Sequence, residues 1–320
     1  MAILATLAAA AATPGCTSPA PGARAPTTTA VGATLPPTLS PTSSGATRPH
    51  ILVIMEENRG YAQTLGSCST DSPDPYFCSL ASQYASSTHW YGVEHPSQPN
   101  YIDIASGADQ GCTSDTCSGL FSATDLGGQL TAAHIPWATY MESMPAPCFT
   151  GESSGEYAHK HNPFIVFADV AHASNCSTVE LPYPGAVGLA AALDAANAPD
   201  FVWISPNLLD DMHDGSIQQG DVWLRTNLSP ILSSPWFADH GTVIITMDEN
   251  DVETGGSCCG DAAGGQLPMV VISENSRGKG SVGLTGDHFG TLRSIEEVYG
   301  LPRLGAAGNA ANGDLGGLFG

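Results

Sequence analysis

Four apolar runs rich in β-branched residues constrain the fold of this chain more than any other feature. They cover residues 50–55, 201–205, 242–246 and 268–273. Continuous runs of this kind, without the alternation of a half-exposed strand, are typical of strands buried on both faces. A shorter run predicts another strand at 135–141, and periodic segments predict helices at 76–85, 126–133, 186–195, 218–232 and 291–299. Alternating strands and helices predict a three-layer α/β/α sandwich with a mainly parallel central sheet.

Polar side chains gather where three of these strands end. Because the carboxyl ends of parallel strands lie along one edge of a sheet, we expect these side chains to converge. The set is Glu57, Asn58, Asn207, Asp211, His213, Asp248 and Glu249. Carboxylate and amide oxygens together with imidazole nitrogens suit a divalent metal ion. Glu56 is the alternative to Glu57, because the register at the end of a strand is open.

Ser97 lies between Pro96 and Pro99, just ahead of an amphipathic run that begins at Tyr101. The prolines restrict the backbone, so a stiff turn is predicted at Ser97, with Asn100 as the N-cap of a following helix. A hydroxyl at a helix N-terminus faces backbone N–H groups and a partial positive charge, which is where an anion such as phosphate binds. A plain capped surface turn also fits these residues.

The charge of the chain excludes some partners. Nine Lys and Arg residues against 31 Asp and Glu residues give a net charge of −22. Such a surface repels nucleic acid and anionic membranes, so we expect no nucleic-acid partner. It would also repel phosphate esters unless the site supplies its own positive charge. A bound divalent metal ion is the obvious source.

The N-terminal part of the chain predicts export. Residues 1–12 are apolar and small like the core of a signal peptide, and the segment 13–16 resembles a bacterial lipoprotein cleavage box that ends at Cys16. Residues 17–48 are rich in Pro, Thr and Ser and predict a disordered tether. The folded domain is expected at 49–320. We expect an extracellular or cell-surface lipoprotein that contacts a membrane only through a lipid on Cys16.

The cysteines are consistent with export. Lipid on Cys16 accounts for the odd member of nine cysteines, and the other eight can form disulfides. The absence of paired C-x-x-C spacings makes a zinc site the weaker reading. Sequence proximity predicts the pairs Cys68–Cys78, Cys112–Cys117, Cys148–Cys176 and the vicinal Cys258–Cys259.

Six spaced blocks of sequence follow one another along the chain: the first strand with Glu57-Asn58, His95 to Tyr101 with Ser106-Gly107, Lys160 to Phe164, Ser205 to Asp214, Asp248-Glu249, and His288 with Leu292 to Glu296. Together they resemble the bacterial phosphoesterase family. This family contains acid phosphatases and phospholipases C and is similar to a branch of the alkaline phosphatase superfamily. The resemblance implies an alkaline phosphatase-like fold for the domain.

The resemblance also implies roles for individual residues. Ser97 matches the nucleophile, and Asn100 would help to hold the phosphate. His161 and His213 would contact the phosphoryl group, one of them as the general acid. Metal ligands are implied at Glu57, Asn58, Asp248 and Glu249, with Asp211 and His288 as further ligands.

The expected function is hydrolysis of a small phosphorylated substrate by a metal-dependent monomer with a serine nucleophile. An acid phosphatase-like phosphomonoesterase is the first choice, and a phospholipase C-type phosphodiesterase is the alternative. A serine esterase is weaker, because residues 151–155 match G-x-S-x-G without the strand and helix that this motif needs. A catalytically silent surface-binding module is the reading of another class.

Overall fold

An eight-stranded sheet organises the chain in the computed structural model, which describes residues 48–251, 260–274 and 279–319. The order of strands is β10-β2-β9-β8-β1-β7-β3-β6. The bounds are β1 (His50–Glu56), β2 (Ala85–Tyr91), β3 (Trp137–Met141), β6 (Glu180–Pro182), β7 (Phe201–Ser205), β8 (Gly241–Met247), β9 (Gln266–Ser273) and β10 (Gly280–Asp287).

The sheet is mainly parallel, as predicted. Only β9 runs antiparallel to its neighbours β8 and β2, and every other neighbouring pair is parallel. The four apolar runs form β1, β7, β8 and β9, each within two residues of its predicted bounds. They are buried along nearly their whole length, which is why their apolar sequences do not alternate.

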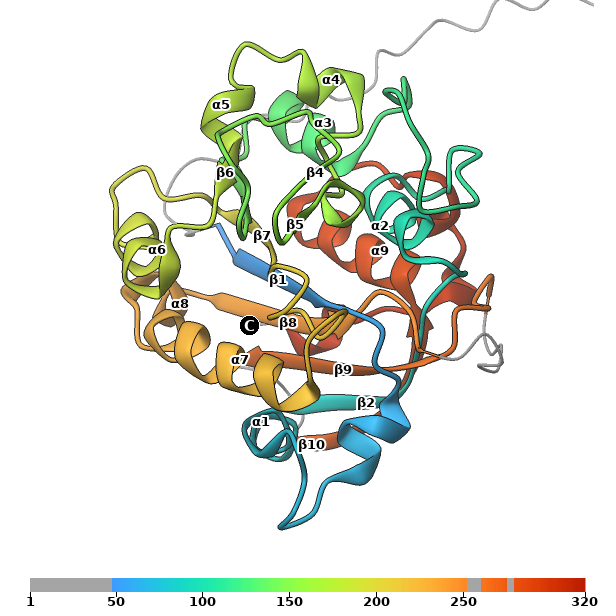
Figure 1. Cartoon of the computed structure of the whole chain (residues 1–320), viewed down its shortest axis with the longest axis vertical. Coiled ribbons are helices and arrows are strands. Elements are labelled where there is room, and N and C mark those ends of the chain that lie inside the picture. The colour runs from blue at the N-terminus through green and yellow to red at the C-terminus, as the bar shows by residue number, and fades with distance from the viewer. Residues whose placement is uncertain (1–47, 252–259, 275–278, 320) are drawn as a thin grey trace, which may run out of the picture. The chain divides into compact units, whose positions relative to one another are not determined.

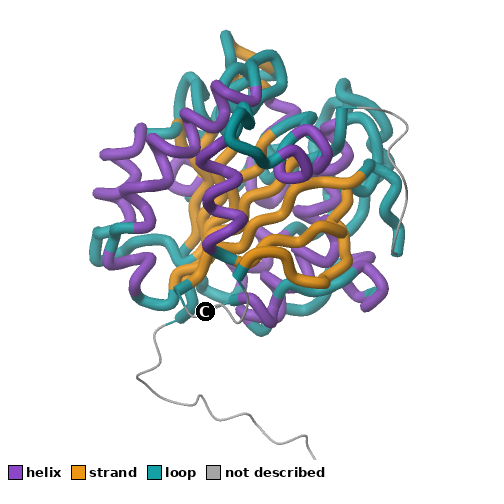
Figure 2. The backbone as a smooth tube through the Cα atoms, turned by 90° about the horizontal axis from the view of Figure 1, so that it is seen from below, coloured by secondary structure: helices purple, strands orange, loops and turns teal. Residues whose placement is uncertain are grey.

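Helices cover both faces of this sheet, and the α/β/α prediction is confirmed (Figures 1 and 2). The helices are α1 (Pro75–Gln83), α2 (Ser97–Ser106), α3 (Leu126–Ala132), α4 (Ala168–Ala171), α5 (Cys176–Val179), α6 (Gly185–Leu193), α7 (Ile217–Leu232), α8 (Pro235–Ala238) and α9 (His288–Tyr299).

Side chains of β1 alternate between two hydrophobic cores. Ile51 and Val53 pack in the core beneath α2, α3 and α9, whereas Leu52 and Ile54 pack in the core beneath α1, α6 and α7. Helices α2 and α9 lie side by side over the first face, in the teal and red parts of Figure 1. The candidate nucleophile therefore sits on a helix that is anchored over the centre of the sheet.

Three strands of the sheet, β2, β6 and β10, and one helix boundary differ from the predictions, and β6 is only three residues long. Strands β2 and β10 were not predicted, because β2 is rich in Ser, Thr and His, and the first part of β10 is only half-buried. Ala85 begins β2 rather than ending a helix. Helix α2 begins at Ser97, so the predicted N-cap at Asn100 is wrong. Pro99 is tolerated in the first turn because N–H groups there need no helical partner.

Three of the predicted disulfides are present: Cys68–Cys78, Cys112–Cys117 and Cys148–Cys176. The predicted pair Cys258–Cys259, the segment 1–16 and residues 17–47 lie outside the described residues. Within the described part of the chain, no helix combines the length and the apolar character needed to span a bilayer.

Candidate active site

The register of two central strands brings the first acidic groups together. Glu56 pairs with Met247 across β1 and β8, so Glu57 and Asp248 follow at the same edge of the sheet. The backbone N–H of Asn58 donates to Asp248 Oδ1 at 3.0 Å. Asn58 has a φ of 52°, a left-handed conformation that asparagine adopts more readily than most residues. The chain reversal after β1 thus holds the Asp248 carboxylate.

Ser97 lies among these carboxylates. It is the first residue of α2 and its side chain is buried. Its hydroxyl oxygen lies 3.2 Å from Glu57 Oε2 and 3.1 Å from Glu249 Oε1, so it can donate to either carboxylate. The structure therefore brings the predicted nucleophile into contact with two of the predicted metal ligands.

Glu57, Asp248 and Glu249 form a buried acidic cluster that fits a divalent cation. Their exposed fractions are 0%, 0% and 5%. Burial, followed by the nearby charge of Glu249, raises the pKa of Asp248 to about 6. Burial and the charge of Asp248 raise the pKa of Glu57 well above its usual value. Asp248 Oδ2 is buried without a hydrogen-bond partner, and a cation would satisfy it.

His161 lies between two carboxylates. Its Nε2 is 3.1 Å from Glu57 Oε1, and its Nδ1 is 3.2 Å from Asp211 Oδ2. Burial, followed by the charge of Lys160, lowers the pKa of His161 to about 3, which keeps the ring neutral near neutral pH. Asp211 was predicted as a metal ligand; the structure places its carboxylate against His161 Nδ1, whereas Glu57 faces His161 Nε2.

Tyr101 is a residue of this site that sequence reasoning missed. Its hydroxyl donates to Glu57 Oε1 at 2.6 Å, and its ring stacks on His161 with the centroids 5.3 Å apart. It lies one helical turn after Ser97 on α2. The spacing of four residues is the signal that could have placed both side chains on the same face.

His213 is the more accessible histidine, with 26% of its side chain exposed. Its Nδ1 lies 2.8 Å from Asp214 Oδ1, and its ring centroid is 5.5 Å from that of His161. Ligand atoms of Glu57, His161 and His213 all lie within 4.8 Å of one another. This triad is a second arrangement that could hold a metal ion, and it shares Glu57 with the acidic cluster.

Asn100 and His288 support the site from behind. The side-chain oxygen of Asn100 accepts from the N–H groups of Val93 and Glu94, and its amide group donates to the carbonyls of Glu94 and Pro96. All four bonds hold the loop before α2. His288 Nε2 donates to the backbone carbonyl of Asp248 at 2.5 Å, which leaves only Nδ1 for a metal ion.

Other sequence candidates lie away from Ser97. Glu56 is the last residue of β1, and both of its carboxylate oxygens are buried without a hydrogen-bond partner. Its neighbour Glu57 makes the contact with Ser97. Asn207 caps its own turn by accepting from the N–H groups of Leu209 and Asp210. The G-x-S-x-G segment forms part of a small hairpin, β4 (Ser153–Ser154) with β5 (Tyr157–Ala158), so the element after Ser153 is a strand and not a helix.

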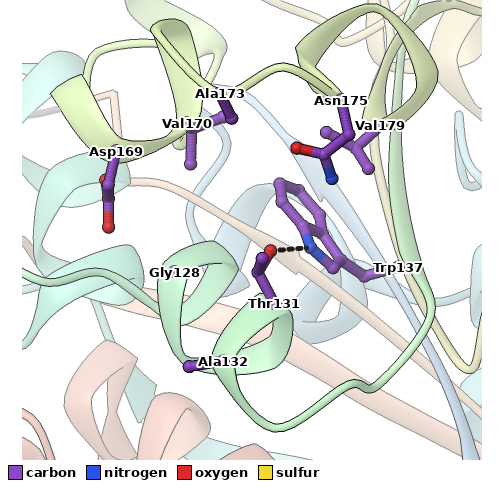
Figure 3. Close-up of a pocket in the computed structure, with 9 residues that line it drawn as sticks. All are labelled: Gly128, Thr131, Ala132, Trp137, Asp169, Val170, Ala173, Asn175 and Val179. Carbon is purple, nitrogen blue, oxygen red and sulfur yellow. Dashed lines mark hydrogen bonds between the residues drawn. The ribbon is translucent and has the colours of Figure 1, made fainter.

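A cavity of about 180 Å³ lies elsewhere, between α3, α4, α5 and β3. Figure 3 shows the Trp137 indole against it, with Trp137 Nε1 donating to Thr131 Oγ1 at 2.9 Å. None of the residues predicted to act in catalysis lines this cavity. Trp137 begins β3, at the opposite end of the strand from the acidic edge. The cavity is therefore not the candidate active site.

Comparison with known proteins agrees with this geometry. Residues 70–302 match the Phosphoesterase family. The chain belongs to this family. A similar protein is the phosphatidylinositol-3-phosphatase of Mycobacterium tuberculosis, which is 32% identical over 267 residues, 82% of this chain and 80% of that protein.

Two fungal acid phosphatases are similar but longer. The probable acid phosphatase of Kluyveromyces lactis is 28% identical, and the match covers 84% of this chain and 62% of that protein. The acid phosphatase of Aspergillus fumigatus is 27% identical, with 73% and 52% covered. The chain thus spans only part of these fungal proteins. With these relatives, it is a hydrolase that acts on phosphoric ester bonds.

Solved structures confirm the fold of this phosphoesterase. The lipoteichoic acid synthase LtaP from Listeria monocytogenes matches with a TM-score of 0.57 and 9% identity, over 84% of this chain and 77% of that one. A protein of the alkaline phosphatase superfamily from Vibrio parahaemolyticus matches with a TM-score of 0.52 and 10% identity, over 81% and 68%. The predicted alkaline phosphatase-like fold is confirmed.

Proposed function

We propose that this protein is an exported, metal-dependent phosphomonoesterase with Ser97 as the nucleophile. The observation that carries this proposal is the position of the Ser97 hydroxyl, 3.2 Å from Glu57 and 3.1 Å from Glu249 at the start of a helix. A carboxylate can take the hydroxyl proton, and the positive end of the α2 dipole favours the negative charge of a phosphoryl group.

The proposed metal ligands are Glu57, Asp248 and Glu249, with Asn58 beside them. A divalent cation held there supplies positive charge that lowers the pKa of the serine hydroxyl and offsets the charge of the phosphoryl oxygens. We propose supporting roles for His288, Asp211 and Asn100. His288 positions Asp248, Asp211 orients His161, and Asn100 fixes the loop before Ser97.

The proposed reaction has two steps, phosphorylation of Ser97 and hydrolysis of the phosphoserine. In the first step, Ser97 Oγ forms a bond to phosphorus, the bond to the leaving oxygen breaks, and the leaving alcohol takes a proton. In the second step, water attacks the phosphoserine, the bond between Oγ and phosphorus breaks, and Ser97 regains a proton. His213 is the proposed acid of the first step, because it reaches solvent whereas buried His161 has a pKa of about 3.

A phosphomonoester is the proposed substrate class, in preference to a phospholipase C-type diester. The relatives described above all carry the name of a phosphatase. Export is part of the proposal, supported by three disulfides in the described part of the chain. Lipid on Cys16 remains a prediction.

Hydrolysis of 4-nitrophenyl phosphate with and without a chelator, for the wild type and Ser97→Ala, tests the proposal. We expect the chelator to stop turnover, added divalent metal to restore it, and Ser97→Ala to be inactive while it still folds. Ester cleavage that ignores the chelator and survives Ser97→Ala would overturn the proposal. Turnover of bis(4-nitrophenyl) phosphate faster than that of the monoester would instead favour a phosphodiesterase.

A further inference from the structure

Lys160 brings a positive charge to the edge of the candidate site. It precedes His161, and 19% of its side chain is exposed. Its ammonium donates to Asp115 Oδ2 at 2.8 Å and lies 3.3 Å from His213 Nε2. An ammonium has three donors, and Asp115 takes one of them, so a donor remains for another acceptor. A cation with a spare donor thus lies beside the proposed general acid.

The place of this ammonium is set by a disulfide-closed loop. Asp115 belongs to the loop between Cys112 and Cys117, and its Oδ1 accepts from the backbone N–H of Gln98 at 3.0 Å. The Gln98 side chain donates to the carbonyl of Cys117 and accepts from its N–H. The Asp115 carboxylate therefore joins the Lys160 ammonium to the backbone of Gln98, which follows Ser97 in the first turn of α2.

Arg59 is a second cation nearby, but its contacts are of another kind. Its guanidinium donates to the carbonyls of Met212 at 2.7 Å and Gly215 at 3.2 Å. It therefore holds the backbone on both sides of His213. Lys160 instead contacts the His213 side chain itself, so its positive charge lies beside the proposed general acid.

We propose that Lys160 selects a phosphomonoester dianion over a phosphodiester monoanion, with Asp115 as its positioning residue. This inference rests on the proposed function. A phosphate monoester carries close to two negative charges near neutral pH, whereas a diester carries one. An ammonium beside a phosphoryl oxygen therefore stabilises the monoester more. The need is greatest here, because the buried carboxylates around Ser97 repel a dianion more than a monoanion.

The test compares Lys160→Met with the wild type on 4-nitrophenyl phosphate and bis(4-nitrophenyl) phosphate, with the metal supplied. Methionine keeps the apolar stem and removes the charge. We expect kcat/KM for the monoester to fall roughly 10- to 100-fold, the range of one charged hydrogen bond. We expect kcat/KM for the diester to fall less than about threefold, since it lacks the second charge. Lys160→Arg should recover part of the monoester rate.

Asp115→Asn tests the positioning role. It keeps the Lys160 charge but weakens its anchor, so we expect a higher KM for the monoester with a smaller change in kcat. The double variant Asp115→Asn/Lys160→Met leaves no buried charge without a partner and should fold even if Lys160→Met does not. Its affinity for inorganic phosphate, measured by calorimetry, should be lower than that of Asp115→Asn alone.

The outcomes separate this inference from the proposed function. A wild type that hydrolyses neither ester in a chelator-sensitive way would remove the proposed function. A chelator-sensitive wild type whose two esters lose rate equally in Lys160→Met, or lose none, would overturn the selection role alone. A double variant that binds inorganic phosphate as tightly as Asp115→Asn alone would also overturn the selection role of Lys160.

Discussion

Ser97 owes its proposed reactivity to groups that arrive from separate parts of the chain. Glu57 follows β1, Glu249 follows β8, and both reach the hydroxyl at the start of α2. His161 then links Glu57 to Asp211 through its two ring nitrogens. Each of these residues contacts the next one through a polar group. Substitutions that keep the shape of a side chain but change its charge or its hydrogen-bond donors are therefore the most informative.

Asp211→Asn tests whether the orientation of His161 matters. One carboxylate oxygen of Asp211 faces His161 Nδ1, and the other accepts from the backbone N–H of His213. An asparagine side chain has only one oxygen, so it can accept on one side only. We expect kcat to fall about 10- to 100-fold, as is typical for partners of site residues. Steady-state kinetics with saturating metal measure this effect.

Asp210→Asn is the matched control, because it removes the same charge one residue away. The Asp210 carboxylate accepts from Asn207 and Gln219 rather than from a site histidine. Its activity should stay close to that of the wild type. Equal losses in both variants would mean that the total charge of the loop matters, and not the orientation of His161.

At the scale of an element, helix α9 supports the acidic cluster of Glu57, Asp248 and Glu249. Its first residue, His288, is fully buried, and its Nε2 donates to the backbone carbonyl of Asp248. The carboxylate on the same residue belongs to the proposed metal site. The helix therefore fixes the backbone of Asp248, whose carboxylate is a proposed metal ligand.

Two substitutions of His288 distinguish support from direct ligation. His288→Ala should weaken metal affinity about 10- to 100-fold, whereas His288→Gln should retain most of it, because a glutamine amide can donate to the same carbonyl. Ser294→Ala on the same helix is the control. It removes the hydroxyl that donates to the Gly290 carbonyl and accepts from Leu315, so we expect lower stability without loss of metal affinity. Titrations of activity and of metal binding measure both effects, and a glutamine variant as weak as alanine would contradict the supporting role.

The elements that sequence predicted best are those with the strongest local signal. The continuous apolar runs could become only buried strands, and the acidic residues after them had to share one edge of the sheet. Strands β2 and β10 were missed because their sequences lack that signal. Tyr101 and Asp115 were missed for another reason. Their roles arise from contacts with Glu57 and Lys160, which lie 44 and 45 residues away along the chain.

At the scale of the whole molecule, buried acids link stability to pH. Burial raises the pKa of Glu180 and of Glu296 to about 7, although neither belongs to the proposed site. The folded protein therefore binds more protons than the unfolded chain between the ordinary pKa of glutamate and about pH 7. Stability must then fall as the pH rises through this window.

Thermal melts of the metal-free protein check this sign. We expect the Tm to be highest near about pH 5 and to fall towards about pH 8, an effect that self-repulsion of an acidic chain reinforces. Glu180→Gln should flatten the curve, because it removes one of the titrating groups and keeps the shape. A Tm that rises across this range would contradict the raised pKa values.

We propose that Ser97 carries the phosphoryl group during turnover. The direct measurement is rapid acid quenching of enzyme, divalent metal and 4-nitrophenyl phosphate, followed by mass spectrometry of the peptides. We expect one added phosphoryl group on Ser97, which is absent with a chelator and in Ser97→Ala. Phosphate on another residue, or turnover in Ser97→Ala at the wild-type rate, would contradict it.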